Sequence, residues 1–133
     1  HATVTEEDLE EGMRQMSLYL VSDFAYEMRD VAGTPENIFY KFIGSSELLT
    51  EVELESLLSQ VTLGLSMRET IDLLLWYGFL GVVNASNDPL FIYDCAYDFR
   101  RLDAERSPQA QDNLYAINPA FLRGLRRKQP QVN

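Results

Sequence analysis

Apolar residues recur at every third or fourth position along the first part of the chain. This spacing is typical of an amphipathic helix, and we predict one long helix over residues 5–32. Its apolar stripe consists of Leu9, Met13, Met16, Leu20, Phe24, Met28 and Val31. Thr5 followed by Asp8 is a capping pattern at its start, and Gly33 is the expected stop. A helix of about 28 residues is about 42 Å long. Because this exceeds what the rest of the chain can cover, part of the stripe is expected to meet another domain or chain.

Three shorter helices are predicted after the long one. The first spans residues 35–43. The second and third each begin at a capping box, formed by Thr50 with Glu53 and by Ser66 with Glu69. Two capped helices separated by a short turn are typical of a helix-turn-helix arrangement.

The pattern changes after Gly78, which is expected to end the third short helix in a left-handed conformation. Residues 79–83 and 90–93 are short apolar runs, and residues 84–89 between them carry turn-forming side chains. This combination predicts a β-hairpin.

The last part of the chain alternates polar and apolar segments. Residues 101–112 are polar and are predicted to form a loop. Residues 114–117 are a candidate third strand, and Asn118 followed by Pro119 predicts the cap of a last short helix.

The element order predicts a mainly α-helical fold with a small β-hairpin or wing. We predict a winged-helix domain (a helix-turn-helix followed by a β wing) preceded by the long amphipathic helix. Residues 1–33 would form the long helix that packs on the domain, residues 34–128 the winged-helix domain, and residues 129–133 a tail. His1 and Ala2 are expected to be a tag remnant. No run of 18 apolar residues without charges occurs, so no membrane span is predicted.

The charges are unevenly distributed along the chain. It carries 11 Lys and Arg against 21 Asp and Glu, a net charge of -10 at pH 7. Residues 1–99 hold four basic and 18 acidic residues, a balance of -14, whereas residues 100–133 hold seven basic and three acidic residues, a balance of +4. A strongly negative body repels phosphate backbones, so duplex DNA is a disfavoured partner for residues 1–99.

The residue types that common enzyme chemistry needs are scarce. The single histidine is His1, and no glycine belongs to a P-loop pattern. Cys95 is the single cysteine and is expected to be buried and inert. The acidic clusters at residues 6–8 and 51–55 fall in predicted first turns of helices, where the helix dipole accounts for them. We therefore predict no enzyme activity, no catalytic residue, no cofactor, no metal ion and no small-molecule substrate for this chain.

Three segments carry a resemblance to a known family. Residues 69–81 (ETIDLLLWYGFLG), 91–94 (FIYD) and 115–121 (YAINPAF) resemble the C-terminal winged-helix region of large bacterial P-loop NTPases, in particular STAND-like or related ATPases. Residues 16–20 followed by Glu27 are similar to the long helix that precedes that region. The resemblance implies that nucleotide hydrolysis belongs to an upstream domain, and it carries over no site residue.

Two hypotheses on function follow from these observations. The leading one is a non-catalytic, cytoplasmic winged-helix module that makes regulatory or assembly contacts with protein, either an upstream ATPase domain or another subunit, a second copy included. Its candidate contact residues are Leu9, Met13, Met16, Arg123, Arg126, Arg127 and Lys128. The alternative is a DNA-binding winged helix that uses the basic C-terminal residues together with Arg68, Arg100, Arg101 and Arg106. A continuous basic stripe beside residues 66–77 would favour DNA, and scattered or paired basic residues would favour protein.

Overall fold

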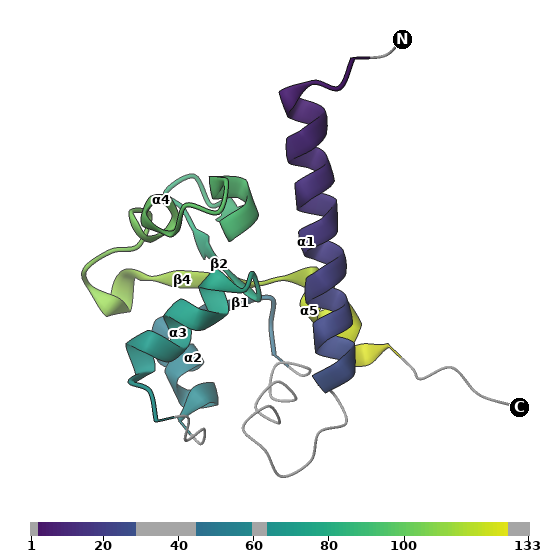
Figure 1. Ribbon diagram of the computed structural model, residues 1–133. Coiled ribbons are helices and arrows are strands. Elements are labelled where there is room, and N and C mark those ends of the chain that lie inside the picture. Colours follow the sequence, from purple (N-terminus) through teal and green to yellow (C-terminus); the bar gives the residue numbers. More distant parts are fainter. Residues whose placement is uncertain (1–2, 29–44, 60–63, 128–133) are drawn as a thin grey trace, which may run out of the picture.

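The computed structural model describes residues 3–28, 45–59 and 64–127 (Figure 1). A long helix, α1 (Glu6–Met28), stands beside a body of short helices and a four-stranded antiparallel sheet. The fold is therefore mainly helical with a small sheet, as predicted. The expected stop at Gly33, the predicted helix at residues 35–43 and the tail at residues 129–133 lie outside the described residues.

The body is built from short elements. In chain order they are β1 (Leu48–Thr50), α2 (Glu51–Leu58), α3 (Met67–Trp76), β2 (Leu80–Val83), β3 (Pro89–Leu90), the 3₁₀ helix η2 (Ile92–Cys95), α4 (Phe99–Asp103), the 3₁₀ helix η3 (Ala110–Asp112), β4 (Leu114–Ile117) and α5 (Pro119–Arg126).

The sheet has the strand order β1-β4-β2-β3, and every neighbouring pair is antiparallel. β2 and β3 form the predicted hairpin, in which Val82 lies opposite Leu90 and Val83 opposite Pro89. β4 is the predicted third strand and lies between β1 and β2. β1 was not predicted, because its three residues are too few to show a period and its pairing partner, β4, lies far along the sequence.

Two expectations for the segment after the hairpin were wrong in part. The second apolar run was predicted to remain a strand up to Tyr93, but β3 ends at Leu90. The cause is Asp94, whose carboxylate accepts a hydrogen bond from the amide of Phe91 and turns the chain into η2. The polar segment that was predicted as a loop begins inside α4, which Asp98 caps through its side chain, and includes η3.

Both predicted capping boxes of the helix pair are present. The hydroxyl of Thr50 accepts from the amide of Glu53, and the Glu53 carboxylate accepts from the amide of Thr50. Ser66 and Glu69 make the same reciprocal pair at the start of α3. Gly78 follows α3 with a φ of 83°, the predicted left-handed conformation, which a side chain with a Cβ adopts only at a cost.

The core lies where the sheet meets α2, α3 and α5. Its fully buried side chains include Tyr115 of β4, Phe121 of α5, Leu54 of α2 and Leu75 of α3. The buried side chain of Asn118 accepts a hydrogen bond from the amide of Ala120 and donates one to the carbonyl of Gly78. This residue therefore caps α5, as predicted, and also joins its start to the end of α3.

α1 packs on α5, and the buried residues of α1 are spaced four apart: Ser17, Val21 and Ala25. The two backbones approach closely at Gly124 of α5. A Cβ at that position would lie 2.1 Å from the carbonyl oxygen of Ser22 and 2.8 Å from the Cβ of Ala25. The close approach explains why the small side of α1, and not its largest apolar residues, faces the body.

The predicted apolar stripe of α1 is consequently exposed. Its described side chains, which we call the α1 stripe, are between 40% and 59% exposed; they are Leu9, Met13, Met16, Leu20 and Phe24. Every residue of α1 as far as Met16 is exposed, and Arg14 ties this half of the helix to the η2 segment (Figure 1). The helix packs on α5 through a face other than the predicted stripe. Val31 and the side chain of Met28 lie outside the described part of the chain.

Candidate functional site

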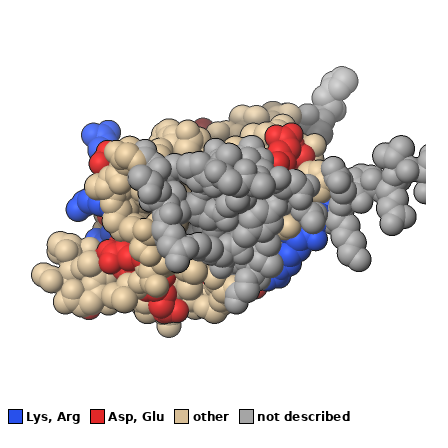
Figure 2. Space-filling view, turned by 90° about the horizontal axis from the view of Figure 1, so that it is seen from below, with Lys and Arg blue, Asp and Glu red and all other residues tan. Residues whose placement is uncertain are grey.

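The basic residues that sequence reasoning singled out lie on separate elements. Arg68 is at the start of α3, Arg100 and Arg101 are exposed on α4, and Arg123 and Arg126 are exposed on α5, which packs against α1. Lys128 lies outside the described residues. Figure 2 accordingly shows blue side chains in two separate areas of the face drawn, one at its left edge and one at its lower right. No continuous basic stripe follows α3 in the described part of the chain.

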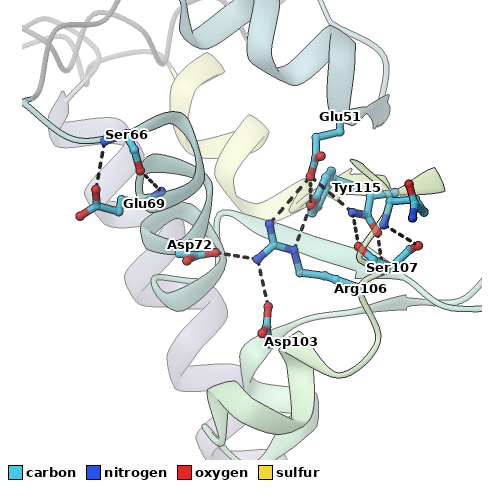
Figure 3. Close-up of polar contacts among 10 residues, drawn as sticks. Glu51, Ser66, Glu69, Asp72, Asp103, Arg106, Ser107 and Tyr115 are labelled. Atoms are coloured by element: carbon cyan, nitrogen blue, oxygen red, sulfur yellow. Dashed lines mark hydrogen bonds and ion pairs between the residues drawn. The ribbon is translucent and has the colours of Figure 1, made fainter. Parts of the chain in front are cut away.

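Arg106 occupies the centre of a buried polar cluster (Figure 3). Its side chain is 9% exposed. Nη1 lies 2.6 Å from the carboxylate of Asp72 on α3 and 3.0 Å from that of Asp103 on α4, and Nη2 lies 3.8 Å from that of Glu51 on α2. Three carboxylates around one guanidinium leave the cluster negative, so Arg106 does not offer its charge to a phosphate.

Tyr115 links this cluster to the sheet. Its hydroxyl accepts a hydrogen bond of 3.0 Å from Nε of Arg106 and donates one of 2.5 Å to Glu51. Burial raises the pKa of Tyr115, and the hydrogen bond to Glu51 adds to that effect. Burial alone would lower the pKa of Arg106, but Tyr115 and Asp72 outweigh it and raise that pKa. Nε of the guanidinium donates to Tyr115, and Nη1 donates to Asp72 and Asp103. Nη2 lies near the carboxylate of Glu51.

Two arginine–aspartate ion pairs connect α1 to other parts of the chain. Nη2 of Arg127 lies 3.4 Å from the carboxylate of Asp23, and its guanidinium carbon lies 4.0 Å from the ring centre of Tyr26. At the middle of α1, Nε of Arg14 lies 3.8 Å from the carboxylate of Asp94. Both pairs are partly exposed, so each contributes little to stability.

A groove lies between α1, the end of α3 and the η2 segment. Its volume is about 690 Å³. Its lining residues are Ser17, Leu20, Val21, Asp23, Phe24, Glu27, Trp76, Tyr77, Gly78, Phe79, Ile92, Tyr93 and Tyr97. We call it the α1–α3 groove. It shares Leu20 and Phe24 with the α1 stripe, so the stripe and the groove form one continuous apolar surface.

Trp76 connects this groove to the exposed face of α3. It also lines a second depression of about 470 Å³, together with Leu65, Leu73 and Phe99, and its ring centre lies 6.2 Å from that of Phe99. The charged residues at this depression are Glu69 and Asp72, both acidic. The face of α3 that a helix-turn-helix would present to DNA is thus apolar and acidic.

Two aromatic residues at the end of α3 are exposed. Trp76 and Tyr77 are 47% and 60% exposed. Both follow directly after the buried pair Leu74 and Leu75, so the helical period of α3 places them outside its buried face. Phe79, by contrast, is buried, and its ring centre lies 4.7 Å from that of Phe121.

The groove is uncharged except for its carboxylates. The phenol of Tyr93 lines it, and burial together with the negative charge of Asp94 raises the pKa of Tyr93 to about 12. This hydroxyl therefore stays protonated at neutral pH and presents a neutral polar atom. Asp23 and Glu27 are the charged groups among the described residues that line the groove.

Other candidate chemistry is sparse in the part of the chain that the structure describes. Cys95 is buried, as expected, and burial raises its pKa, which disfavours the reactive thiolate. Within the described ranges, His, Cys, Asp and Glu residues form no group of three that could hold a metal ion. None of the described helices combines the length and apolar character that crossing a lipid bilayer requires.

The comparisons with known proteins identify no relative of this chain. No protein-family model matches this chain, and no curated protein and no solved structure matches it either.

Proposed function

We propose that this chain is a non-catalytic, winged-helix protein-interaction module of a larger cytoplasmic ATPase. The observation that carries the interaction role is the exposed apolar surface formed by the α1 stripe and the α1–α3 groove. Large contiguous apolar patches on the surface of a protein mark sites of contact with other macromolecules. Here the patch lies on a helix in which every described residue as far as Met16 is exposed.

The order of elements supports the winged-helix assignment. Two capped helices, α2 and α3, precede the hairpin formed by β2 and β3, which is the order of a helix-turn-helix with a wing. β1 and β4 complete a small sheet beside the helix pair. Membership of an ATPase and a cytoplasmic location rest on the resemblance of residues 69–81, 91–94 and 115–121.

The surface of α3 favours protein over DNA as the partner. A recognition helix presents Arg, Lys, Asn or Gln to base edges, whereas the exposed face of α3 presents Leu73, Trp76 and two carboxylates. Arg68 is the single basic residue on α3. Phosphate contacts supply most non-specific DNA affinity, and this face has little to offer them.

Hydrogen–deuterium exchange tests the interaction role. In this chain alone, the amides of residues 6–16 should exchange rapidly, because every residue of this half-helix is exposed and it is tied to the body through the partly exposed side chain of Arg14. Isolated helices of this length are marginal. In the full-length protein that contains the chain, the same amides should become protected, while those of β4, which lies between β1 and β2 and outside the groove, stay unchanged as an internal control. Met13→Glu should remove that protection. Equal exchange of residues 6–16 in the two proteins would contradict the proposal.

Duplex DNA should not bind measurably at physiological salt. If binding appears at low salt, the slope of log affinity against log salt should be about 2 or less in magnitude, since few phosphates can be neutralised. Fluorescence anisotropy with a labelled duplex measures this. The variant Arg123→Ala with Arg126→Ala should remove the residual binding, because both side chains are exposed on α5. Submicromolar, sequence-selective binding with a steep salt slope would instead favour the DNA-binding alternative.

A further inference from the structure

We infer that the α1–α3 groove binds an amphipathic helix of a partner protein that carries Lys or Arg beside its apolar residues. This inference rests on the proposed interaction role and specifies the chemistry of the partner. Binding of an amphipathic helix in an apolar groove is a recurring mode of recognition, with anchors three or four residues apart. The α1 stripe from Leu9 to Phe24 is about 22 Å long at 1.5 Å per residue, which matches a helix of several turns.

The lining of the groove selects an apolar anchor. Leu20 and Phe24 contribute one wall, and Trp76 and Tyr77 contribute the other. All four side chains are exposed in the chain by itself. Because exposed apolar surface gains free energy on leaving water, an apolar side chain seated between these walls would be bound favourably. Phe24 is already positioned for this role, since its ring stacks on Phe79 at 5.3 Å between ring centres.

The charges of the groove select a basic partner. Asp23 and Glu27 lie on its α1 side, and Glu69 lies beyond Trp76 on the face of α3. No Lys or Arg is among the described residues that line the groove. A cation beside the exposed faces of Trp76 and Tyr77 would gain both the ring and the carboxylate interactions. Arg127, directly after α5, contacts Asp23, but this ion pair is partly exposed and therefore weak, so a cation of the partner can take the place of Arg127.

The same charges argue against a second copy of this chain as the occupant. α1 carries seven acidic residues and one basic residue, Arg14. Arg14 already contacts Asp94 and the ring of Tyr93. Two α1 helices placed side by side would therefore bring like charges together, which disfavours association. A helix of opposite charge has no such penalty.

Trp76 provides a direct readout, because it is the single tryptophan of the chain and it lines the groove. The probe is a Trp-free amphipathic peptide of about 18 residues, or about 27 Å as a helix, with Leu and Phe on one face and Lys and Arg beside them. Two matched peptides serve as controls. One replaces every Lys and Arg by Glu, and the other has the basic composition in a scrambled order that lacks an apolar face.

The basic amphipathic peptide should shift the emission of Trp76 to shorter wavelength and bind at least tenfold more tightly than either control peptide. Asp23→Asn with Glu27→Gln should weaken its binding about tenfold, and Tyr77→Ser should weaken it as well. The matched control, Glu105→Gln with Asp112→Asn, changes two exposed carboxylates outside the groove and should leave binding unaltered. Circular dichroism of each variant verifies that the fold is retained.

Three results would overturn the inference. One is equal binding of the basic and acidic peptides, the second is no binding of any peptide, and the third is binding that the groove variants leave unchanged. Concentration-dependent dimerisation in light scattering that Leu20→Ser abolishes would assign the groove to a second copy instead. The interaction role itself is tested separately by the exchange of residues 6–16 in the full-length protein. If those amides become protected but the basic peptide does not bind, the interaction role stands and the inferred partner chemistry fails. If neither effect occurs, both proposals fail.

Discussion

Replacing Arg106 by alanine should lower the free energy of unfolding by about 3–5 kcal/mol, the range found when one partner of a buried ion pair is removed. The substitution leaves the buried carboxylate of Glu51 without its cation and removes the positive charge between Asp72 and Asp103. The hydroxyl of Tyr115 also loses a donor. Domains of this size are stable by about 5–15 kcal/mol in total, so this loss is a large share. Urea denaturation followed by circular dichroism measures it.

Two further variants make this prediction specific. Arg100→Ala removes a charge of the same kind from a side chain that is 96% exposed, so it should change stability by less than about 0.5 kcal/mol. If the alanine variant of Arg106 does not fold, Arg106→Lys keeps the charge and loses the planar fork of donors, and it should fold with reduced stability. Wild-type stability of Arg106→Ala would show that the cluster contributes nothing to the fold.

The second large effect concerns the crossing of α1 and α5. Gly124→Ala should destabilise the domain by about 1–3 kcal/mol, as overpacking of a close contact does. The reason is geometric, because the new Cβ would lie 2.1 Å from the carbonyl oxygen of Ser22, a backbone atom that cannot move without shifting α1. Thermal or chemical unfolding of the variant measures the effect.

Gly12→Ala is the matched control, because it makes the same substitution in the exposed half of α1. A Cβ at Gly12 meets no atom within 4 Å. Alanine is favoured over glycine inside a helix by about 0.5–1 kcal/mol, so this variant should be neutral or more stable. Opposite signs for the two substitutions are the expected result. If Gly124→Ala were as stable as Gly12→Ala, that result would contradict the close approach of α1 and α5 at Gly124.

The helix boundaries could be predicted because their signals are local. The capping boxes at Thr50 and Ser66 and the left-handed Gly78 each involve residues within a few positions of one another. The orientation of α1 could not be predicted in this way. Its apolar period is real, but Gly124 allows a closer contact with the small residues of α1 than its large residues would permit, and this depends on a helix at the other end of the sequence.

The candidate site shows the same division. The exposed stripe at Leu9, Met13 and Met16 could be proposed from sequence, because the predicted helix was longer than the body could cover. The burial of Arg106 could not, since its carboxylate partners come from α2, α3 and α4. From sequence, a basic residue in a polar segment is predicted to be exposed to solvent. Its burial becomes evident only when the fold brings acidic residues from distant elements next to it.

The contact between α1 and α5 also determines when the domain can complete its folding during synthesis. The ribosome makes α1 long before α5, so Ser22 and Ala25 have no helix to pack on until residues 119–126 have emerged. β4 is made only shortly before α5, and without it β1 and β2 have no strand between them. Domains generally fold as units during translation. A nascent chain halted ahead of Pro119 would therefore expose the apolar surfaces of its unfinished core and be held by chaperones or degraded.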